Sequence, residues 1–442
     1  MNRPSPPTHL AASTSPFAAL AAGLAAVCLL PLVTAAAELP ADRHLGVATC
    51  AASQCHGSAV ARDGSAVLQN EYVTWTSHDP HAASYRTLRS DASVAMAARL
   101  GLANAHTADI CLDCHADNVP AARRGERFQL SDGVGCEACH GGAERWIDTH
   151  YNTPVVSHAD NLAAGLYPNE RPAARAELCL SCHLGTDDRF ATHRIMAAGH
   201  PRLAFELDTF TELWRTAGGL QHFRVDDDYR ERKGAASHVE TWATGLLADT
   251  RRRLALLQGG RLATDGLFPE LGLFDCHACH RSMKSVQWRR LPRHGDADPG
   301  EPFIADGSFV MSMVLARAIA PEIAAAIEAA LAGLHSARGA AGKRAAAAVL
   351  DREAVRLQAA ADADTLRRGQ RDIMNALLDA GAAGEYLDYG SAEQAFMAVQ
   401  MLAFELGDAP LQEELDRLAA ALQDDESYRP AQFARLLALA AR

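Results

Sequence analysis

The distribution of apolar and polar positions divides the chain into three regions. An apolar run extends from Phe17 to Ala37, and stretches rich in Ala, Leu, Glu and Arg occupy the chain from about residue 306 onward. In Pro321–His335 and Leu411–Leu422 the apolar residues recur at the helical period. The region between is rich in Gly, Pro and His, which predicts short helices joined by loops and almost no sheet.

We therefore expect a mainly α fold in three segments: an N-terminal segment 1–37, a middle domain 38–300 and a helical C-terminal region 301–442. Glycine ends helices and begins turns because it adopts backbone angles that other residues avoid. The glycines that we expect at breaks between the C-terminal helices are Gly339, Gly342, Gly381 and Gly390.

The N-terminal segment has the features of an export signal. A basic residue, Arg3, precedes the apolar run, and three small residues, Ala35 to Ala37, stand before Glu38. This order fits a cleaved signal peptide and predicts a periplasmic protein. Because the run is long enough to span a bilayer, an uncleaved membrane anchor is the alternative.

The charge balance limits the kinds of partner. The chain has 54 acidic and 42 basic residues, a net charge of -12. Nucleic-acid binding requires a clustered basic surface, so we expect no nucleic-acid partner. A protein partner with a basic patch would dock favourably on an acidic surface, although the same charge also serves solubility.

The cysteines indicate the chemistry of the middle domain. Eleven are present; Cys28 lies in the apolar run, and the other ten form five pairs, each followed directly by His. The five motifs are Cys50-Ala-Ala-Ser-Gln-Cys55-His56, Cys111-Leu-Asp-Cys114-His115, Cys136-Glu-Ala-Cys139-His140, Cys179-Leu-Ser-Cys182-His183 and Cys276-His-Ala-Cys279-His280.

Such spacing is typical of covalent haem attachment. Two thiols three positions apart lie on one side of a helical turn and form thioethers to one porphyrin, while the adjacent His binds the iron. Zinc ribbons and disulfides also use paired cysteines, but zinc does not need a His directly after the second Cys. Five repetitions therefore predict five covalent haem c groups, with a bulge in the longer first loop.

Further histidines are available for the opposite side of each iron. Besides the five histidines that end the motifs, twelve histidines lie from His44 to His294. A low-potential haem usually has a second His ligand. Since twelve exceed the five required, some of them must have other roles.

Three further segments resemble the cytochrome c554-like multihaem cytochromes and, more loosely, hydroxylamine oxidoreductase and octahaem tetrathionate reductase. These segments are Trp75-Thr-Ser-His-Asp-Pro-His81-Ala82, Gly133-Val-Gly-Cys-Glu-Ala-Cys-His-Gly-Gly142 and Gly199-His200-Pro201-Arg-Leu-Ala-Phe-Glu206. Cytochrome c554 itself carries four haems at ordinary motifs, whereas this chain has five motifs and a helical tail.

The resemblance implies a mainly helical fold around closely packed haem pairs and distal histidines in such segments. On this basis we expect His81, His150 and His200 to be distal ligands. Candidates for the other irons are His44, His106, His222 and His238; His78, His158, His193 and His294 could replace a preferred neighbour. Arg123, Arg124 and Arg127 could bind haem propionates or be ordinary surface charges.

Two functions agree with these features. The first is an exported pentahaem electron carrier that exchanges electrons with redox proteins, including a membrane electron-transfer complex. The second is a haem oxidoreductase in which one iron keeps an open position for a small nitrogen or sulfur compound. The number of distal ligands distinguishes the two, and the excess of histidines favours the carrier.

Overall fold

A computed structural model describes residues 42–65, 67–152, 155–215, 221–260, 262–263, 269–280, 290–298 and 300–441. The predicted export segment 1–37 lies outside the described residues. Within them the chain is mainly helical, as predicted, and the only strand-like pairings are two isolated bridges, His44 with Arg124 and Phe274 with Ile304. Among the described helices, none combines the length and apolar character that a membrane span needs.

The N-terminal part consists of short helices and turns. Its α-helices are α1 (Glu71–His78), α2 (Ser84–Thr87), α3 (Asp91–Leu100), α4 (Asp109–His115), α5 (Cys136–His140), α6 (His158–Ala163), α7 (Pro172–His183), α8 (His193–Ala197), α9 (Leu207–Arg215) and α10 (Asp227–Lys233). Its 3-10 turns are η1 (Val47–Thr49), η2 (Pro80–Ala83), η3 (Ala105–Thr107), η4 (Ala121–Arg123) and η5 (Leu130–Asp132).

Few apolar side chains are buried among these elements. One small cluster consists of Leu88, Ala97, Ala105, Leu112 and Ala116. A cluster of this size buries little apolar surface, which limits its contribution to stability. The short helices and the loops between them agree with the prediction made from the Gly, Pro and His content of this region.

The C-terminal region is a bundle of longer helices. After the long α11 (His238–Gln258) come η7 (Leu271–Leu273), α12 (Cys276–Cys279) and η8 (Pro292–His294). The bundle consists of α13 (Gly307–Ile319), α14 (Pro321–Ser336), α15 (Gly339–Ala360), α16 (Ala363–Ala382), α17 (Tyr389–Glu405), α18 (Ala409–Ala420) and α19 (Pro430–Ala440). The two stretches of helical period predicted from the sequence thus correspond to α14 and α18.

The expected glycine breaks lie close to helix ends. Gly339 begins α15 with a positive φ of 65°, and Gly390 lies in the first turn of α17. Gly342 and Gly381 are inside helices, in the first turn of α15 and the last turn of α16. At Gly381 a Cβ atom would lie 2.1 Å from Leu437 Cδ1, so this glycine permits close packing of α16 on α19 rather than a break.

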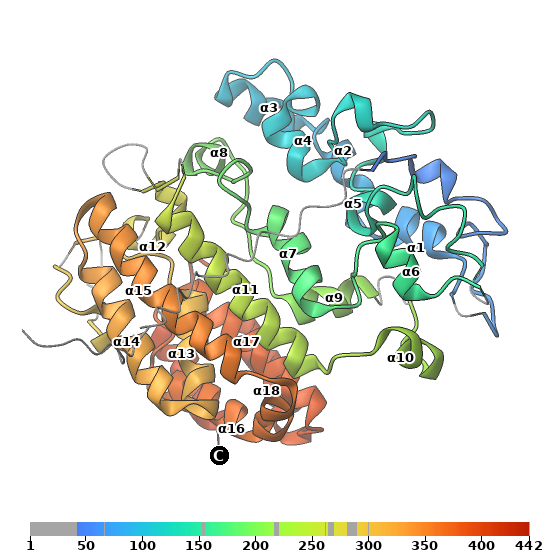
Figure 1. The fold of residues 1–442 in the computed structure, drawn as a ribbon. Helices are drawn as coiled ribbons and strands as arrows, with labels where there is room; N and C mark the ends of the chain where they lie inside the picture. The colour runs from blue at the N-terminus through green and yellow to red at the C-terminus, as the bar shows by residue number, and fades with distance from the viewer. Residues whose placement is uncertain are drawn as a thin grey trace, which may run out of the picture. The chain divides into compact units, whose positions relative to one another are not determined.

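Helix α11 joins the two parts of the described chain. Figure 1 shows it between α7 and α9 on one side and the bundle helices α13, α15 and α17 on the other. One continuous cluster of buried side chains extends from Leu180 on α7 through Trp242 and Leu254 on α11 to Phe309 on α13. The motif helix α7 is therefore packed on the same apolar core as the bundle.

The start of α11 is held by an ion pair with α9. The helix begins with a capping box, in which Ser237 accepts from the Glu240 N–H and Glu240 accepts from the Ser237 N–H. His238 Nδ1 lies 3.1 Å from both carboxylate oxygens of Asp208. The hydrogen bond and charge of Asp208 raise the pKa of His238 to about 9.

We predict that this ion pair makes stability depend on pH. Because the folded-state pKa of His238 is raised, its contribution is complete below about pH 6.5 and is lost as the pH rises through about 9. The His238 side chain is 47% exposed, so solvent screening limits the effect to about 0.5 kcal/mol. Urea unfolding of His238→Gln should therefore show a lower free energy of unfolding than the parent at pH 6 and an equal one at pH 10.

The exposed His78, at the end of α1, provides the control. His78→Gln should match the parent at both pH values. A deficit of His238→Gln that is the same at pH 6 and pH 10 would contradict the electrostatic explanation.

Candidate functional site

The five cysteine motifs adopt local structures that bring each pair of thiols to one side of a turn. Four of them form or end helices, namely α4, α5, α7 and α12. Cysteines three residues apart lie on the same face of such a helix. The ten motif cysteines form no disulfides, and no described group of His, Cys, Asp and Glu is arranged to hold a metal ion by itself.

The first motif has no helix and instead closes as a tight turn. Cys55 N–H donates to Ala52 O at 2.9 Å, and His56 N–H donates to Cys50 O at 3.2 Å. The next residue, Gly57, passes so close to Ala51 that a Cβ atom would lie 2.0 Å from its carbonyl oxygen. The extra residues of the motif are thus folded into a bulge, and His56 still directly follows the second thiol.

Four motif histidines face a second imidazole from a distant part of the chain. The ring centroids are separated by 6.2 Å for His56 and His150, 6.3 Å for His115 and His200, 6.0 Å for His183 and His81, and 6.1 Å for His280 and His193. Two imidazoles bound to one metal at ~2 Å per bond have centroids about 6 Å apart once the ring radii are added. The spacing of all four pairs fits an iron between the rings.

The remaining motif histidine, His140 of the third motif, is half-buried and lies near His222. Burial and, second to it, the charge of His222 lower the pKa of His140 to about 3. His222 is half-buried too, and this desolvation lowers its pKa as well. Both rings therefore favour the neutral form, the form in which imidazole binds a metal.

Hydrogen bonds at Nδ1 orient most of the paired rings. Three rings contact backbone carbonyl oxygens: His150 with Ile147 at 2.7 Å, His200 with Pro201 at 2.8 Å and His115 with Ser84 at 3.3 Å. Two contact carboxylates: His56 with Glu71 at 2.9 Å and His81 with Asp79 at 2.8 Å. Metal-binding histidines usually donate their other N–H in this way, which leaves Nε2 available to the metal.

The pKa values of the paired rings depend on their burial and on the charges of these partners. Burial, and then the charge of His81, lowers the pKa of His183 to about 4. Burial opposes protonation of His56 and His81 too, but the carboxylates of Glu71 and Asp79 outweigh it and raise the pKa of both rings.

Two other predicted ligands have different surroundings. His44 is buried, its Nδ1 lies 2.6 Å from Asp117 Oδ2, and its Nε2 is enclosed without a hydrogen-bond partner. His106 meets the edge of the Tyr85 ring at 6.3 Å. Neither ring faces a motif histidine in the ring contacts of the described residues, so the ligand roles of His44 and His106 stay predictions.

His193, treated above only as a substitute, is the ring that faces His280. The sequence signal that could have identified it is its position seven residues before His200, at the first residue of α8. The candidate His238 contacts Asp208, and two of the other reserve histidines contact an acidic or aromatic neighbour: His158 with Glu170 and His294 with Phe303.

The predicted propionate ligands are partly engaged with the backbone. Arg123 donates to Asp42 O at 3.0 Å, and Arg124 donates to Val119 O at 2.9 Å and covers the Phe128 ring. Arg127 is exposed. The two engaged arginines hold the segment before the first motif and the loop after the second motif in place.

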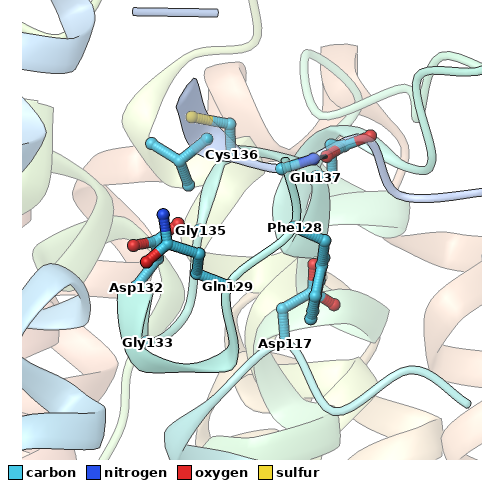
Figure 2. Close-up of a pocket in the computed structure, with 10 residues that line it drawn as sticks. Asp117, Phe128, Gln129, Asp132, Gly133, Gly135, Cys136 and Glu137 are labelled. Carbon is cyan, nitrogen blue, oxygen red and sulfur yellow. Dashed lines mark hydrogen bonds between the residues drawn. The ribbon is translucent and has the colours of Figure 1, made fainter. Parts of the chain in front are cut away.

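Glu137, inside the third motif, connects that motif to the residues just before the first motif. Its buried carboxylate accepts the N–H groups of Leu45 and Gly46 at 2.7 Å and that of Ala143 at 2.8 Å. Figure 2 shows Glu137 and Cys136 beside a small cavity, with Asp117 and Phe128 among the other residues that line it. Three N–H donors compensate the buried charge, so Glu137 fixes the first and third motifs relative to each other.

Comparison with known proteins found one match, in the region of the first three motifs. Residues 49–141, which contain the first three motifs, match the family model described as cytochrome c554 and c-prime. No curated protein and no solved structure matches the chain. Over this region the chain is therefore similar to the cytochrome c554 and c-prime family, which supports a c-type cytochrome with covalently bound haem c that takes part in electron transfer.

Proposed function

We propose that the chain is an exported pentahaem electron carrier in which every iron is held between two histidines. The observation that carries this proposal is the spacing of 6.0 to 6.3 Å between four motif histidines and a second imidazole. The distal ligands would be His150, His200, His222, His81 and His193 for the first, second, third, fourth and fifth motifs, respectively. When bound, each haem iron would supply a one-electron couple.

Two imidazoles per iron suit electron transfer more than catalysis. A six-coordinate iron offers no open position to a small substrate, so its redox change needs little rearrangement of ligands. An oxidoreductase would need at least one motif histidine without a second ring opposite. The four ring pairs favour the carrier over that alternative.

Contacts between motifs support a relay from site to site. The side chains of Cys50 and Cys136 are neighbours, and so are those of Cys114 and Cys182. Cys139 of the third motif lies near Cys179 and Cys182 of the fourth. The attachment points therefore neighbour one another in the order first, third, fourth and second.

The fifth site connects to this series through a short segment. His193 begins α8 and His200 follows its end, so the second rings of the fifth and second sites are seven residues apart. Electrons would enter from one redox protein and leave to another, including a membrane electron-transfer complex, in the periplasm. The net charge of -12 favours a partner with a basic docking surface.

The haem count tests the first part of the proposal. Expressed with a c-type maturation system, the mature chain should gain five haem masses that survive denaturation, because thioethers are covalent. The double variant Cys50→Ala/Cys55→Ala should retain four. A parent with four haems would exclude the first motif, and zinc in place of iron would refute haem binding altogether.

Export is tested by the N-terminus of the purified protein. We expect sequencing to begin near Glu38, since cleavage follows small residues such as Ala35 to Ala37. An intact Met1 on a membrane-bound protein would instead identify the segment as an anchor.

Removal of one distal ring tests the ligand assignment. His200→Ala should keep five covalent haems but lose one axial ligand, because the thioethers hold the porphyrin independently of that ring. Electron paramagnetic resonance should show one new high-spin ferric signal, and one iron should now bind cyanide.

His106→Ala is the matched control, because His106 contacts Tyr85 instead of a motif histidine. It should retain the parent spectrum and remain closed to cyanide. A parent-like spectrum of His200→Ala would exclude His200 as a ligand.

A further inference from the structure

Helix α1 has a carboxylate at each end, and each carboxylate contacts a different ring pair. Glu71, the first residue of α1, contacts Nδ1 of the motif histidine His56. Asp79, which follows the last residue of α1, contacts Nδ1 of His81, the ring opposite His183. The remaining Nδ1 contacts found for the paired rings are to neutral carbonyl oxygens, at His115, His150 and His200.

The two carboxylates are fixed and shielded from solvent. The side chain of Asp79 is 5% exposed, and the oxygen that contacts the His81 ring also accepts the His81 backbone N–H at 2.9 Å. The Glu71 side chain is 16% exposed, and its second oxygen accepts the Gln69 N–H at 3.1 Å. Trp75 Nε1 donates to Val134 O at 3.2 Å, which attaches α1 to the segment before the third motif.

A charged acceptor acts on an imidazole more strongly than a carbonyl does. A carboxylate that accepts the Nδ1 hydrogen draws the proton toward itself and makes the opposite nitrogen more basic. A more basic ligand stabilises ferric iron relative to ferrous iron. A buried negative charge nearby has the same effect, because it is poorly screened and favours the more positive metal.

We propose that Glu71 and Asp79 are positioning residues that lower the reduction potentials of the first and fourth haems relative to the second. The proposal rests on the ligand pairs proposed above, but it concerns residues that do not touch the iron. The order of potentials along the relay would then be set by α1, through the kind of acceptor that each ring meets.

The test uses isosteric substitutions that remove the charge and keep an acceptor oxygen. Glu71→Gln and Asp79→Asn should each retain five low-spin haems, because an amide oxygen still accepts from Nδ1. In each variant one component of the potentiometric titration should move to higher potential. An increase of about tenfold in the equilibrium constant for reduction would move that component upward by ~59 mV, because each haem is a one-electron couple.

Asp208→Asn is the matched control. Asp208 is also a buried carboxylate that contacts Nδ1 of a histidine, His238. The ring of His238 has no contact with a motif histidine among the ring contacts of the described residues. The titration of this variant should superimpose on that of the parent.

The outcomes separate this proposal from the ligand assignment. Parent-like titrations of both α1 variants would overturn the proposal while five low-spin haems in the parent still supported bis-histidine ligation. A new high-spin signal in either variant would also overturn it, because the carboxylate would then be needed for ligation itself. A parent that already contains high-spin iron would instead count against the proposed ligand pairs.

Discussion

A ring spacing of about 6 Å is the constraint on which the rest of the structure depends. An iron atom between two imidazoles requires both rings to approach from opposite sides at a fixed distance. The members of all four such pairs, for example His56 and His150, are more than eighty residues apart in sequence. Loops, caps and backbone contacts must therefore position distant segments to within a few tenths of an ångström.

The two parts of the described chain hold their segments in place by different interactions. The N-terminal part has a small apolar cluster and relies on specific polar contacts, such as the three N–H groups that bind Glu137. The helical bundle has an extensive apolar core that continues through α11 to α7. Because α7 ends in a motif histidine, the bundle supplies a rigid base for one side of the haem region.

The sequence alone predicts the features that depend on local residue spacing, such as motifs and helices. It does not predict the features that depend on tertiary contacts, such as the partner of a ring. Cysteines three residues apart and the His that follows are recognisable because one helical turn brings them together. The same holds for α14, whose apolar period matches the observed helix. By contrast, the sequence does not show that Asp117, seventy-three residues later, holds the ring of His44. His193 and Gly381 likewise acquire their roles from partners in other helices, His280 and Leu437.

The segment from His193 to His200 has a consequence for maturation. Attachment of haem needs only the local motif, so each thioether pair can form on an unfolded chain. A distal ring arrives only when its own segment folds, and this segment contains the rings opposite both His115 and His280. The Thr192 cap, which fixes the start of α8, and Gly199, which turns the chain with a φ of 120°, thus act on two sites at once. In the proposed ligation the second and fifth irons would become six-coordinate in a single cooperative step.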